Sequence, residues 1–300
     1  MMGTHVLCSP QCVQFLSRFW SSQLLRVRPH LYLFINRVFR GINKKLVEKL
    51  RNYIFYCQKE LITFVLDWLN PVCEVRELPA SFESLSSLHI PLLSLPRLFS
   101  TSVSTIPTQP SFSSPPSNLP SNLGLPKSPG SLSVGLVWSS DPANQKLYTR
   151  KSLKLCNLIP RFLQLAELDL LSLHNLQIGP DSDQFIPYSG HQNVHNTASL
   201  IKDFSDTAHI ISQLDLVVSV DTAVAHLSAS LNCPTWLMLP WNCDYRWLLD
   251  SSHSPWYPKS MRIFRQQSKG DWQSVIDSIY ASLDEVFMLS IDDLHQSKSL

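Results

Sequence analysis

The sequence predicts an α/β fold whose clearest part is a parallel sheet in the C-terminal half of the 300-residue chain. Three continuous apolar runs, Ser133–Trp138, Asp215–Val220 and Thr235–Leu239, are expected to be buried strands. Helical patterns follow at Thr222–Leu231 and Trp272–Val286. Because apolar strands alternate with helices, the pattern favours a doubly wound parallel sheet. The other elements expected in this half are a strand at Leu168–Leu173 and a helix at Thr197–Leu214.

The N-terminal region is predicted to be rich in helix. A short strand is expected at residues 4–8, and long helices are expected at 11–28 and 31–69 because apolar residues recur there at helical spacing. Residues 88–99 are apolar but broken by two prolines, so a short strand and a turn are expected. The residues that set the pattern of the second helix are Leu46, Leu50, Ile54 and Cys57.

A change in composition separates these two regions. Residues 107–131 contain seven prolines, seven serines, no acidic residue and one basic residue, Lys127. A segment this polar and proline-rich is expected to connect domains and not to pack. The predicted organisation is therefore an N-terminal domain at 1–106, a linker at 107–132, a second domain at 133–288 and a tail at 289–300.

Glycine is scarce, with 8 residues in 300, and two common nucleotide-binding loops are absent from the sequence. There is no G-x-G-x-x-G and no G-x-x-x-x-G-K-[ST]. Gly130 and Gly135 have the second spacing but are followed by Leu136 and Val137. Glycine-rich phosphate cradles of these two kinds are therefore excluded.

The net charge of +2 hides an uneven distribution. Residues 1–60 hold ten Lys or Arg and two Glu, whereas the other residues hold 15 basic and 21 acidic side chains. Residues 18–59 could therefore contact a polyanion or an anionic membrane surface. A solvated helix face explains the same pattern.

Cysteine use and hydropathy indicate a cytoplasmic protein. The seven cysteines are scattered and form no C-x-x-C pair, so reduced thiols are expected and a metal site is not. The N-terminus lacks a signal-peptide pattern, and no run of 18 apolar residues predicts a membrane-spanning helix.

The sharpest local feature is Val217–His226, where a buried strand ends at Asp221 and a helix follows at once. Ligands of open α/β sheets bind at the carboxyl ends of strands. Thr222 could cap this helix and leave backbone N–H groups for a phosphate, with His226 one turn further on the same side. The alternative is that Asp221 and Thr222 only cap the helix and that His226 is a core residue.

A second feature follows the next apolar strand, which ends at Pro240. The aromatic residues after it, again at a carboxyl end, could stack on a base. Trp247 and Trp256 are instead expected to pack in the core or in a lid.

These features occur in ordered blocks that resemble glycosyltransferase family 9, the heptosyltransferase-like family, in versions often attached to tetratricopeptide repeats. The resemblance covers residues 134–286, about half of the chain. Before the linker, Ile90–Phe99 and Thr105–Pro107 are similar to the end of the family's N-terminal domain. The matching blocks are Val134–Trp138, Asp203–Thr207, Leu214–His226, Trp236–Pro240, Asp244–Trp247, Ser254–Pro258, Phe264–Gln266 and Gly270–Trp272.

The resemblance implies a GT-B-like transferase with a Rossmann-like C-terminal domain that binds a nucleotide-diphosphate sugar. The N-terminal domain, here incomplete, would bind the acceptor. Transfer would invert the anomeric centre without a metal or cofactor, because helix N-termini and basic side chains neutralise the leaving diphosphate. The residues carried over to the donor site are Trp138, Ser139, Arg150, Lys151, Gln177, Asp206, Thr207, Asp221, Thr222, Ala223, His226 and Pro240.

Several of these residues have a structural alternative. Gln177 could be a buried amide, and Asp206 and Thr207 could cap a helix. Either Arg150 or Lys151 would take leaving-group charge, and a surface cation is the alternative.

The chain departs from the family at its start. Family members open with a Gly-Leu-Gly-Asp loop whose acidic residue is regarded as the general base. This chain resembles the family's second strand from Gly3 onward and has no aspartate before Asp67, so the catalytic residue is unassigned. Three hypotheses follow: an active glycosyltransferase, an inactive relative that still binds a nucleotide sugar, or an interaction protein that uses its basic N-terminal arm.

Overall fold

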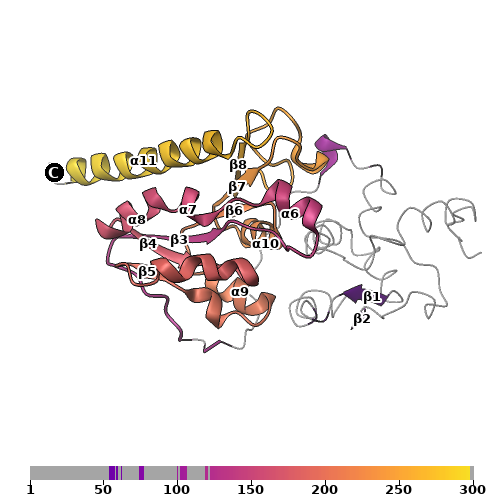
Figure 1. The fold of residues 1–300 in the computed structure, drawn as a ribbon, viewed down its shortest axis with the longest axis horizontal. Helices are drawn as coiled ribbons and strands as arrows, with labels where there is room; N and C mark the ends of the chain where they lie inside the picture. Colours follow the sequence, from indigo (N-terminus) through magenta and orange to yellow (C-terminus); the bar gives the residue numbers. More distant parts are fainter. Residues whose placement is uncertain are drawn as a thin grey trace, which may run out of the picture.

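The computed structural model describes the C-terminal half of the chain almost completely (Figure 1). The predicted strand at 4–8, the helix at 11–28, most of the helix at 31–69 and the strand and turn at 88–99 lie outside the described residues. The described residues are 54–57, 59, 62, 74–77, 100, 102–106, 119–120 and 122–297, without the side chains of 54–57, 75 and 288–297.

Six parallel strands form the sheet of the C-terminal half, in the order β5-β4-β3-β6-β7-β8. The first of them along the chain, β3, lies in the middle, and the order matches the doubly wound order of Rossmann-like domains. The α/β class predicted from the sequence is therefore confirmed. The strands are β3 (Leu132–Val137), β4 (Leu171–Asn175), β5 (Val194–His195), β6 (Leu216–Val220), β7 (Thr235–Leu239) and β8 (Met261–Arg265).

Helices cover both faces of this sheet (Figure 1). Helices α7, α8 and α11 pack on one face, and α9 and α10 pack on the other. The α-helices are α6 (Gln145–Lys151), α7 (Leu155–Leu158), α8 (Pro160–Glu167), α9 (Phe204–Ile211), α10 (Ala223–Ser230) and α11 (Trp272–Ser297). The 3-10 helices are η4 (Val103–Thr105), η5 (Pro180–Tyr188), η6 (Thr197–Leu200) and η7 (Tyr245–Trp247).

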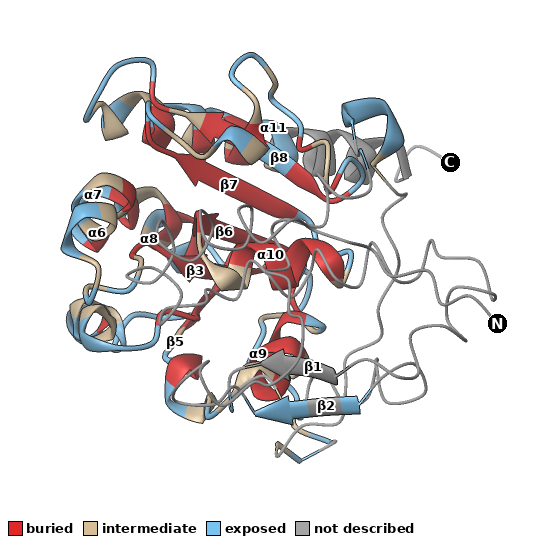
Figure 2. Cartoon of the chain, turned by 90° about the vertical axis from the view of Figure 1, so that its right-hand side faces the viewer, coloured by how far each residue is buried: buried red, intermediate tan, exposed pale blue. Residues whose placement is uncertain are grey.

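Strand side chains alternate between two hydrophobic clusters. In β6, Leu216, Val218 and Val220 pack with α7, α8 and α11, whereas Val217 packs with α9 and α10. Every residue of β6 and β7 is buried, as the red strands in Figure 2 show. Burial on both faces requires continuous apolar strands, which explains why the sequence predicts these two correctly.

The region between β5 and β6 differs from the single helix predicted at Thr197–Leu214. Helix η6 ends at Leu200, and α9 begins only after Asp203. The Asp203 carboxylate accepts hydrogen bonds from the N–H groups of Ser205 and Asp206, at 2.8 and 3.0 Å. This N-cap starts a new helix, so one apolar pattern becomes two short elements. The sequence also did not predict β8, whose apolar residues are interrupted by arginines.

The predicted helix at 31–69 is wrong at Ile54–Cys57. These residues form strand β1, which pairs in parallel with β2 (Glu74–Glu77). Ile, Phe and Tyr favour strands, and pairing with a distant segment overrides the helical spacing of the apolar residues.

The end of the predicted linker packs against the sheet domain. The backbone N–H of Leu125 donates to Oε1 of Gln213 at 3.0 Å, and Lys127 pairs with Asp215 at 2.7 Å. The expectation that this segment does not pack is therefore wrong for residues 122–131, because its polar groups find partners beside the amino end of β6.

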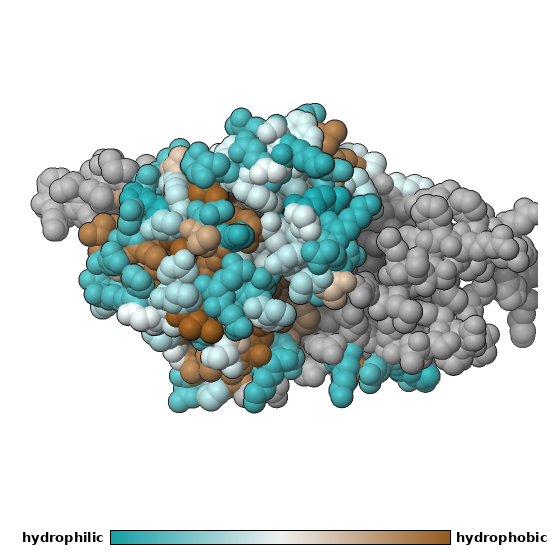
Figure 3. Space-filling model, in the orientation of Figure 1, coloured by the Kyte–Doolittle hydropathy of each residue, from teal (hydrophilic) through white to brown (hydrophobic). Residues whose placement is uncertain are grey.

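The described surface is mostly hydrophilic on the face shown in Figure 3, with smaller hydrophobic areas between. Exposed large apolar side chains include Leu168, after α8, and Trp241 and Leu249, in the loop after β7. None of the described helices combines the length and the hydropathy needed to cross a membrane.

Gly135 is a test of packing between β3 and two leucines of neighbouring loops, Leu176 after β4 and Leu214 before β6. A Cβ at this position would lie 2.6 Å from Cδ1 of Leu176 and 2.7 Å from Cδ1 of Leu214. We expect Gly135→Ala to lower the free energy of unfolding by about 1–3 kcal/mol, as overpacking does, in urea denaturation. Gly124→Ala is the control, because no atom lies within 4 Å of a Cβ there. Equal stability of the two variants would contradict the tight approach.

Acid should destabilise the domain through His174 in β4. Burial, and then the nearby His195 and Lys127, lower the pKa of His174 to about 3. Because an unfolded imidazole titrates near pH 6.5, the stability linked to His174 is complete above this pH and is lost as the pH falls towards 3. We expect roughly 2 kcal/mol of unfolding free energy to be lost between pH 7 and pH 5 on this account. The His174→Leu variant should lose correspondingly less unfolding free energy between pH 7 and pH 5. The same pH dependence in the variant and the wild type would refute the assignment of this loss to His174.

Candidate functional site

The strand order creates a topological switch point between β3 and β6. The strand after β3 lies on one side of this pair, and the strand after β6 lies on the other. Ligands of open α/β sheets bind outside the carboxyl ends of strands at such a point. Trp138 and Ser139 follow β3 there, and Asp221 and Thr222 follow β6. Residues predicted for the donor site therefore meet at one edge of the sheet.

Asp221 is the centre of this edge. Its carboxylate forms an ion pair with Lys151, the last residue of α6, and the two side chains are 1% and 3% exposed. Oδ1 of Asp221 lies 3.8 Å from Nε2 of His226 in α10. The structure thus brings together three predicted residues, from the end of α6, the turn after β6 and the first turn of α10. We call Lys151, Asp221 and His226 the Asp221 cluster.

His226 also contacts two aromatic residues that were not predicted for the site. Nδ1 of His226 lies 3.0 Å from the Tyr257 hydroxyl, and its ring centroid lies 5.1 Å from that of Trp247. Burial is the main cause that lowers the pKa of His226 to about 3, and Arg246 lowers it further, while Asp221 opposes both. The imidazole is therefore neutral at pH 7.

Arg246, in η7, is a second cation beside the Asp221 cluster and was not among the residues predicted for the donor site. Its side chain is 13% exposed, and its Nε lies 2.8 Å from Oδ1 of Asp244. Burial alone would lower the pKa of Arg246, but Asp221 and Asp244 raise it, so the guanidinium stays charged. The only sequence signal was the matching block Asp244–Trp247.

Helix α10 begins beside the cluster, with Thr222 at the N-cap position. The prediction that the Thr222 hydroxyl caps this helix is wrong, because that hydroxyl is hydrogen-bonded to the Ser219 hydroxyl at 3.1 Å. The Thr222 side chain makes no cap hydrogen bond to the first turn. Ala223 and Val224 are half-buried, so backbone N–H groups near the surface carry the positive end of the helix dipole.

Gln177 makes the contacts of a buried amide. Its Oε1 accepts hydrogen bonds from the backbone N–H groups of Trp138 at 3.2 Å and Ser139 at 2.9 Å, which joins the loops after β3 and β4. The Trp138 ring is fully buried and stacks on Phe185 at 6.3 Å. The Ser139 hydroxyl donates to Asp181. The hydrogen bonds and packing of these side chains therefore hold the loop after β3 in place.

Asp206 and Thr207 are buried in the first turn of α9. Oδ2 of Asp206 accepts a hydrogen bond from the N–H of Lys202 at 3.0 Å, and the Thr207 hydroxyl donates to the carbonyl of Asp203 at 2.9 Å. The cap of α9 is Asp203, whereas these contacts of Asp206 and Thr207 order the turn that starts the helix.

Pro240 and Arg150 complete the predicted set. Pro240 is buried directly after β7, and the N–H of the next residue, Trp241, donates to Oε1 of Gln266 at 3.0 Å. Arg150 is half-buried, and its Nε has no hydrogen-bond partner among the described residues. Of the two adjacent cations in α6, Lys151 is therefore the one that pairs with Asp221.

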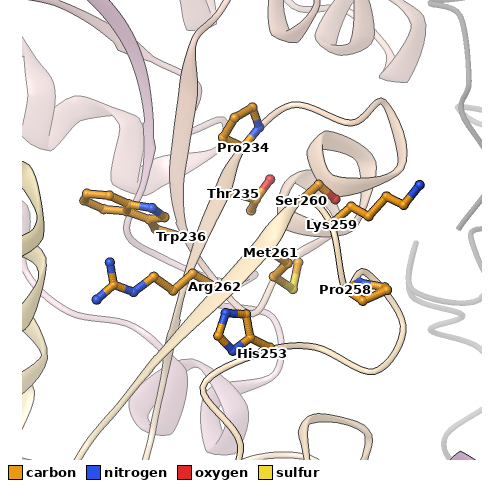
Figure 4. Close-up of a pocket in the computed structure, with 9 residues that line it drawn as sticks. All are labelled: Pro234, Thr235, Trp236, His253, Pro258, Lys259, Ser260, Met261 and Arg262. Atoms are coloured by element: carbon orange, nitrogen blue, oxygen red, sulfur yellow. The ribbon is translucent and has the colours of Figure 1, made fainter. Parts of the chain in front are cut away.

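A pocket of about 240 Å³ lies at the opposite edge of the sheet, where β7 and β8 begin (Figure 4). Thr235 and Met261, the first residues of these strands, line it together with Lys259 and Arg262. Because parallel strands place their amino ends together, this pocket is separate from the Asp221 cluster. Within the described part of the chain, no group of three His, Cys, Asp or Glu side chains could hold a metal ion.

No protein-family model and no curated protein sequence matches the chain. The structure is similar to E. coli heptosyltransferase WaaC with ADP, at 14% identity and a TM-score of 0.44, over 89% of this chain and 81% of that chain. It is also similar to E. coli heptosyltransferase WaaC with ADP-2-deoxy-2-fluoro heptose, at 13% identity and a TM-score of 0.40, over 80% and 76%. Likenesses this distant do not assign a ligand, so the function must be inferred from the residues of the site.

The Lys151–Asp221 pair should be far more costly to break than to replace. Lys151→Met leaves a buried carboxylate without its cation, and we expect it to lower the free energy of unfolding by about 3–5 kcal/mol in urea denaturation. The double variant Lys151→Met/Asp221→Leu should recover most of this loss, because a hydrophobic pair can replace a buried ion pair.

Lys127→Met is the matched control for this cycle. It breaks the ion pair between Lys127 and Asp215, whose side chains are 38% and 44% exposed, respectively. Because solvent screens this pair, the substitution should lower the free energy of unfolding by at most about 1 kcal/mol. Additive effects of the Lys151 and Asp221 substitutions would show that the buried pair is not coupled.

Proposed function

We propose that residues 133–288 form the donor domain of a GT-B-like member of glycosyltransferase family 9 and bind a nucleoside-diphosphate sugar at the carboxyl edge of β3 and β6. The observation that carries this proposal is the buried Asp221 cluster at the switch point, beside a helix start without a side-chain cap. Two blocks that resemble the family, Leu214–His226 and Asp244–Trp247, supply most of the charged groups there.

A diphosphate suits this edge because three positive groups there can donate hydrogen bonds to it, although Asp221 and Asp244 balance the charges of the two cationic side chains. Lys151 and Arg246 are cationic side chains, and the N-terminus of α10 carries partial positive charge. An ammonium group can donate three hydrogen bonds, so Lys151 could hold Asp221 and a phosphate oxygen together. These groups would neutralise the charge that develops on the leaving diphosphate in an inverting transfer.

Binding without transfer is the second candidate, and among the described residues the pairing of Asp221 and Asp244 with cations favours it. Asp221 is paired with Lys151, and Asp244 is paired with Arg246. A carboxylate held by a cation is a poor general base, because the cation stabilises its charged form. We therefore expect measurable binding and weak transfer, with the acceptor on the side of residues 1–106.

We also propose a cytoplasmic location. Cys156, Cys233 and Cys243 carry free thiols, which suits a reducing compartment. The contact of residues 18–59 with an anionic surface stays a prediction, because most of these residues lie outside the described part of the chain.

Titration calorimetry with ADP, UDP and GDP and their sugars tests the proposal. We expect at least one of them to bind, and Lys151→Met to weaken its binding about 10- to 100-fold, since a charge-assisted hydrogen bond contributes about 1.5–3 kcal/mol. Arg246→Met is a second test that leaves the buried Lys151–Asp221 pair in place, and it should weaken binding in the same direction.

Lys259→Met is the matched control, because it removes a lysine from the pocket at the opposite edge of the sheet. It should bind like the wild type. The proposal fails when no nucleotide binds, or when Lys259→Met weakens binding as much as the two site variants do.

A further inference from the structure

Tyr257 lies behind the Asp221 cluster and was not among the residues predicted for the donor site. It is 5% exposed, and its hydroxyl lies 3.0 Å from Nδ1 of His226. Its N–H donates to Oγ of Ser254 at 3.2 Å, and its carbonyl accepts from the N–H of Met261, which begins β8, at 3.1 Å. These contacts hold the backbone of Tyr257 in place, and the hydroxyl contact with His226 joins the residue to α10.

The surroundings of His226 determine which ring nitrogen carries the proton. A neutral imidazole has one N–H donor and one acceptor nitrogen. Nε2 lies 3.8 Å from Oδ1 of Asp221, and the hydrogen bond at one nitrogen fixes the state of the other. A carboxylate only accepts, whereas a tyrosine hydroxyl can also donate. We infer that Tyr257 is a positioning residue whose hydroxyl donates to Nδ1 and thereby keeps His226 neutral, with its proton on Nε2 towards Asp221.

This arrangement gives each carboxylate oxygen of Asp221 its own neighbour. Oδ2 pairs with Lys151, and Oδ1 faces the Nε2–H of His226. A protonated imidazole would bring a further positive charge next to Lys151 and Arg246 and would compete with Lys151 for the carboxylate.

Protonation at Nδ1 requires that the Tyr257 hydroxyl stop donating there, so the hydroxyl favours the neutral ring. Tyr257 therefore preserves the Lys151–Asp221 pair. The consequence for phosphate binding rests on the proposed function.

Long-range proton–nitrogen NMR of the full chain reads this tautomer directly. The His226 signals are identified by their loss in His226→Gln. At pH 7 the wild type should show a pyridine-type Nδ1 and a pyrrole-type Nε2.

In Tyr257→Phe, the Nδ1 signal should move to the position of a pyridine-type nitrogen without a hydrogen bond. The pKa of His226 should rise by about one unit, the size expected for one lost hydrogen bond to the neutral form.

Tyr280→Phe is the matched control. It removes a hydroxyl that donates to the carbonyl of Leu158 at 2.8 Å on the other face of the sheet, so the signals and the pKa of His226 should stay unchanged. A wild-type spectrum with the proton on Nδ1 would overturn the inference, and this result needs no variant to fold. A Tyr257→Phe spectrum and pKa equal to those of the wild type would overturn it as well.

Nucleotide affinity separates this inference from the proposed function. If a nucleoside diphosphate binds the wild type, Tyr257→Phe should weaken that binding about tenfold, the equivalent of about one hydrogen bond. An unchanged affinity would overturn the positioning role. If no nucleotide binds the wild type while the NMR results hold, the proposed function fails and the assignment of the His226 tautomer stands.

Discussion

The buried ion pair between Lys151 and Asp221 is the constraint on which the carboxyl edge of the sheet depends. It joins the end of α6, which follows β3, to the residue that leads from β6 into α10. Taking both charges out of water costs several kcal/mol, and their attraction offsets this only while both partners are present. A well-packed hydrophobic pair of similar volume can often replace such a pair with little loss of stability. The buried pair is therefore weak evidence for stability, and it is consistent with the diphosphate site proposed above.

Two buried glutamines support the loops on either side of this pair. Gln177 binds the backbone N–H groups that follow β3. Gln266 accepts hydrogen bonds from the N–H groups of Trp241 at 3.0 Å and Gly270 at 3.1 Å, which joins the loops after β7 and β8. Each amide oxygen satisfies two backbone donors that the loops would otherwise bury unpaired. Because β6 lies between β3 and β7, the Asp221 cluster is flanked by loops that side chains hold in place.

The parts of the site that the local sequence pattern predicts lie at one strand–helix junction, whereas Lys151, Trp138 and Ser139 were predicted only from the family resemblance. Asp221 and His226 lie within six residues of each other, at the end of a strand whose burial on both faces makes it a continuous apolar run. Arg246 and Tyr257 reach the cluster only through the packing of the segment between β7 and β8, so no local spacing reveals them. The sequence could not decide whether Arg150 or Lys151 pairs with Asp221. Adjacent residues of a helix point about 100° apart, so the residue at which α6 begins determines which of the two side chains faces Asp221.

The charges around Asp221 are balanced, and this explains why the state of His226 matters. Lys151 and Arg246 face Asp221 and Asp244, while His226 is neutral. A charged imidazole would strengthen the attraction for every anion, because a Coulomb field does not distinguish a diphosphate from a simple anion. A neutral ring in a fixed orientation leaves selection to the directions of the N–H groups of α10 and of the two cations. If the edge binds a diphosphate as proposed, the hydrogen bond at Nδ1 of His226 affects which anion is preferred more than how strongly anions in general are attracted.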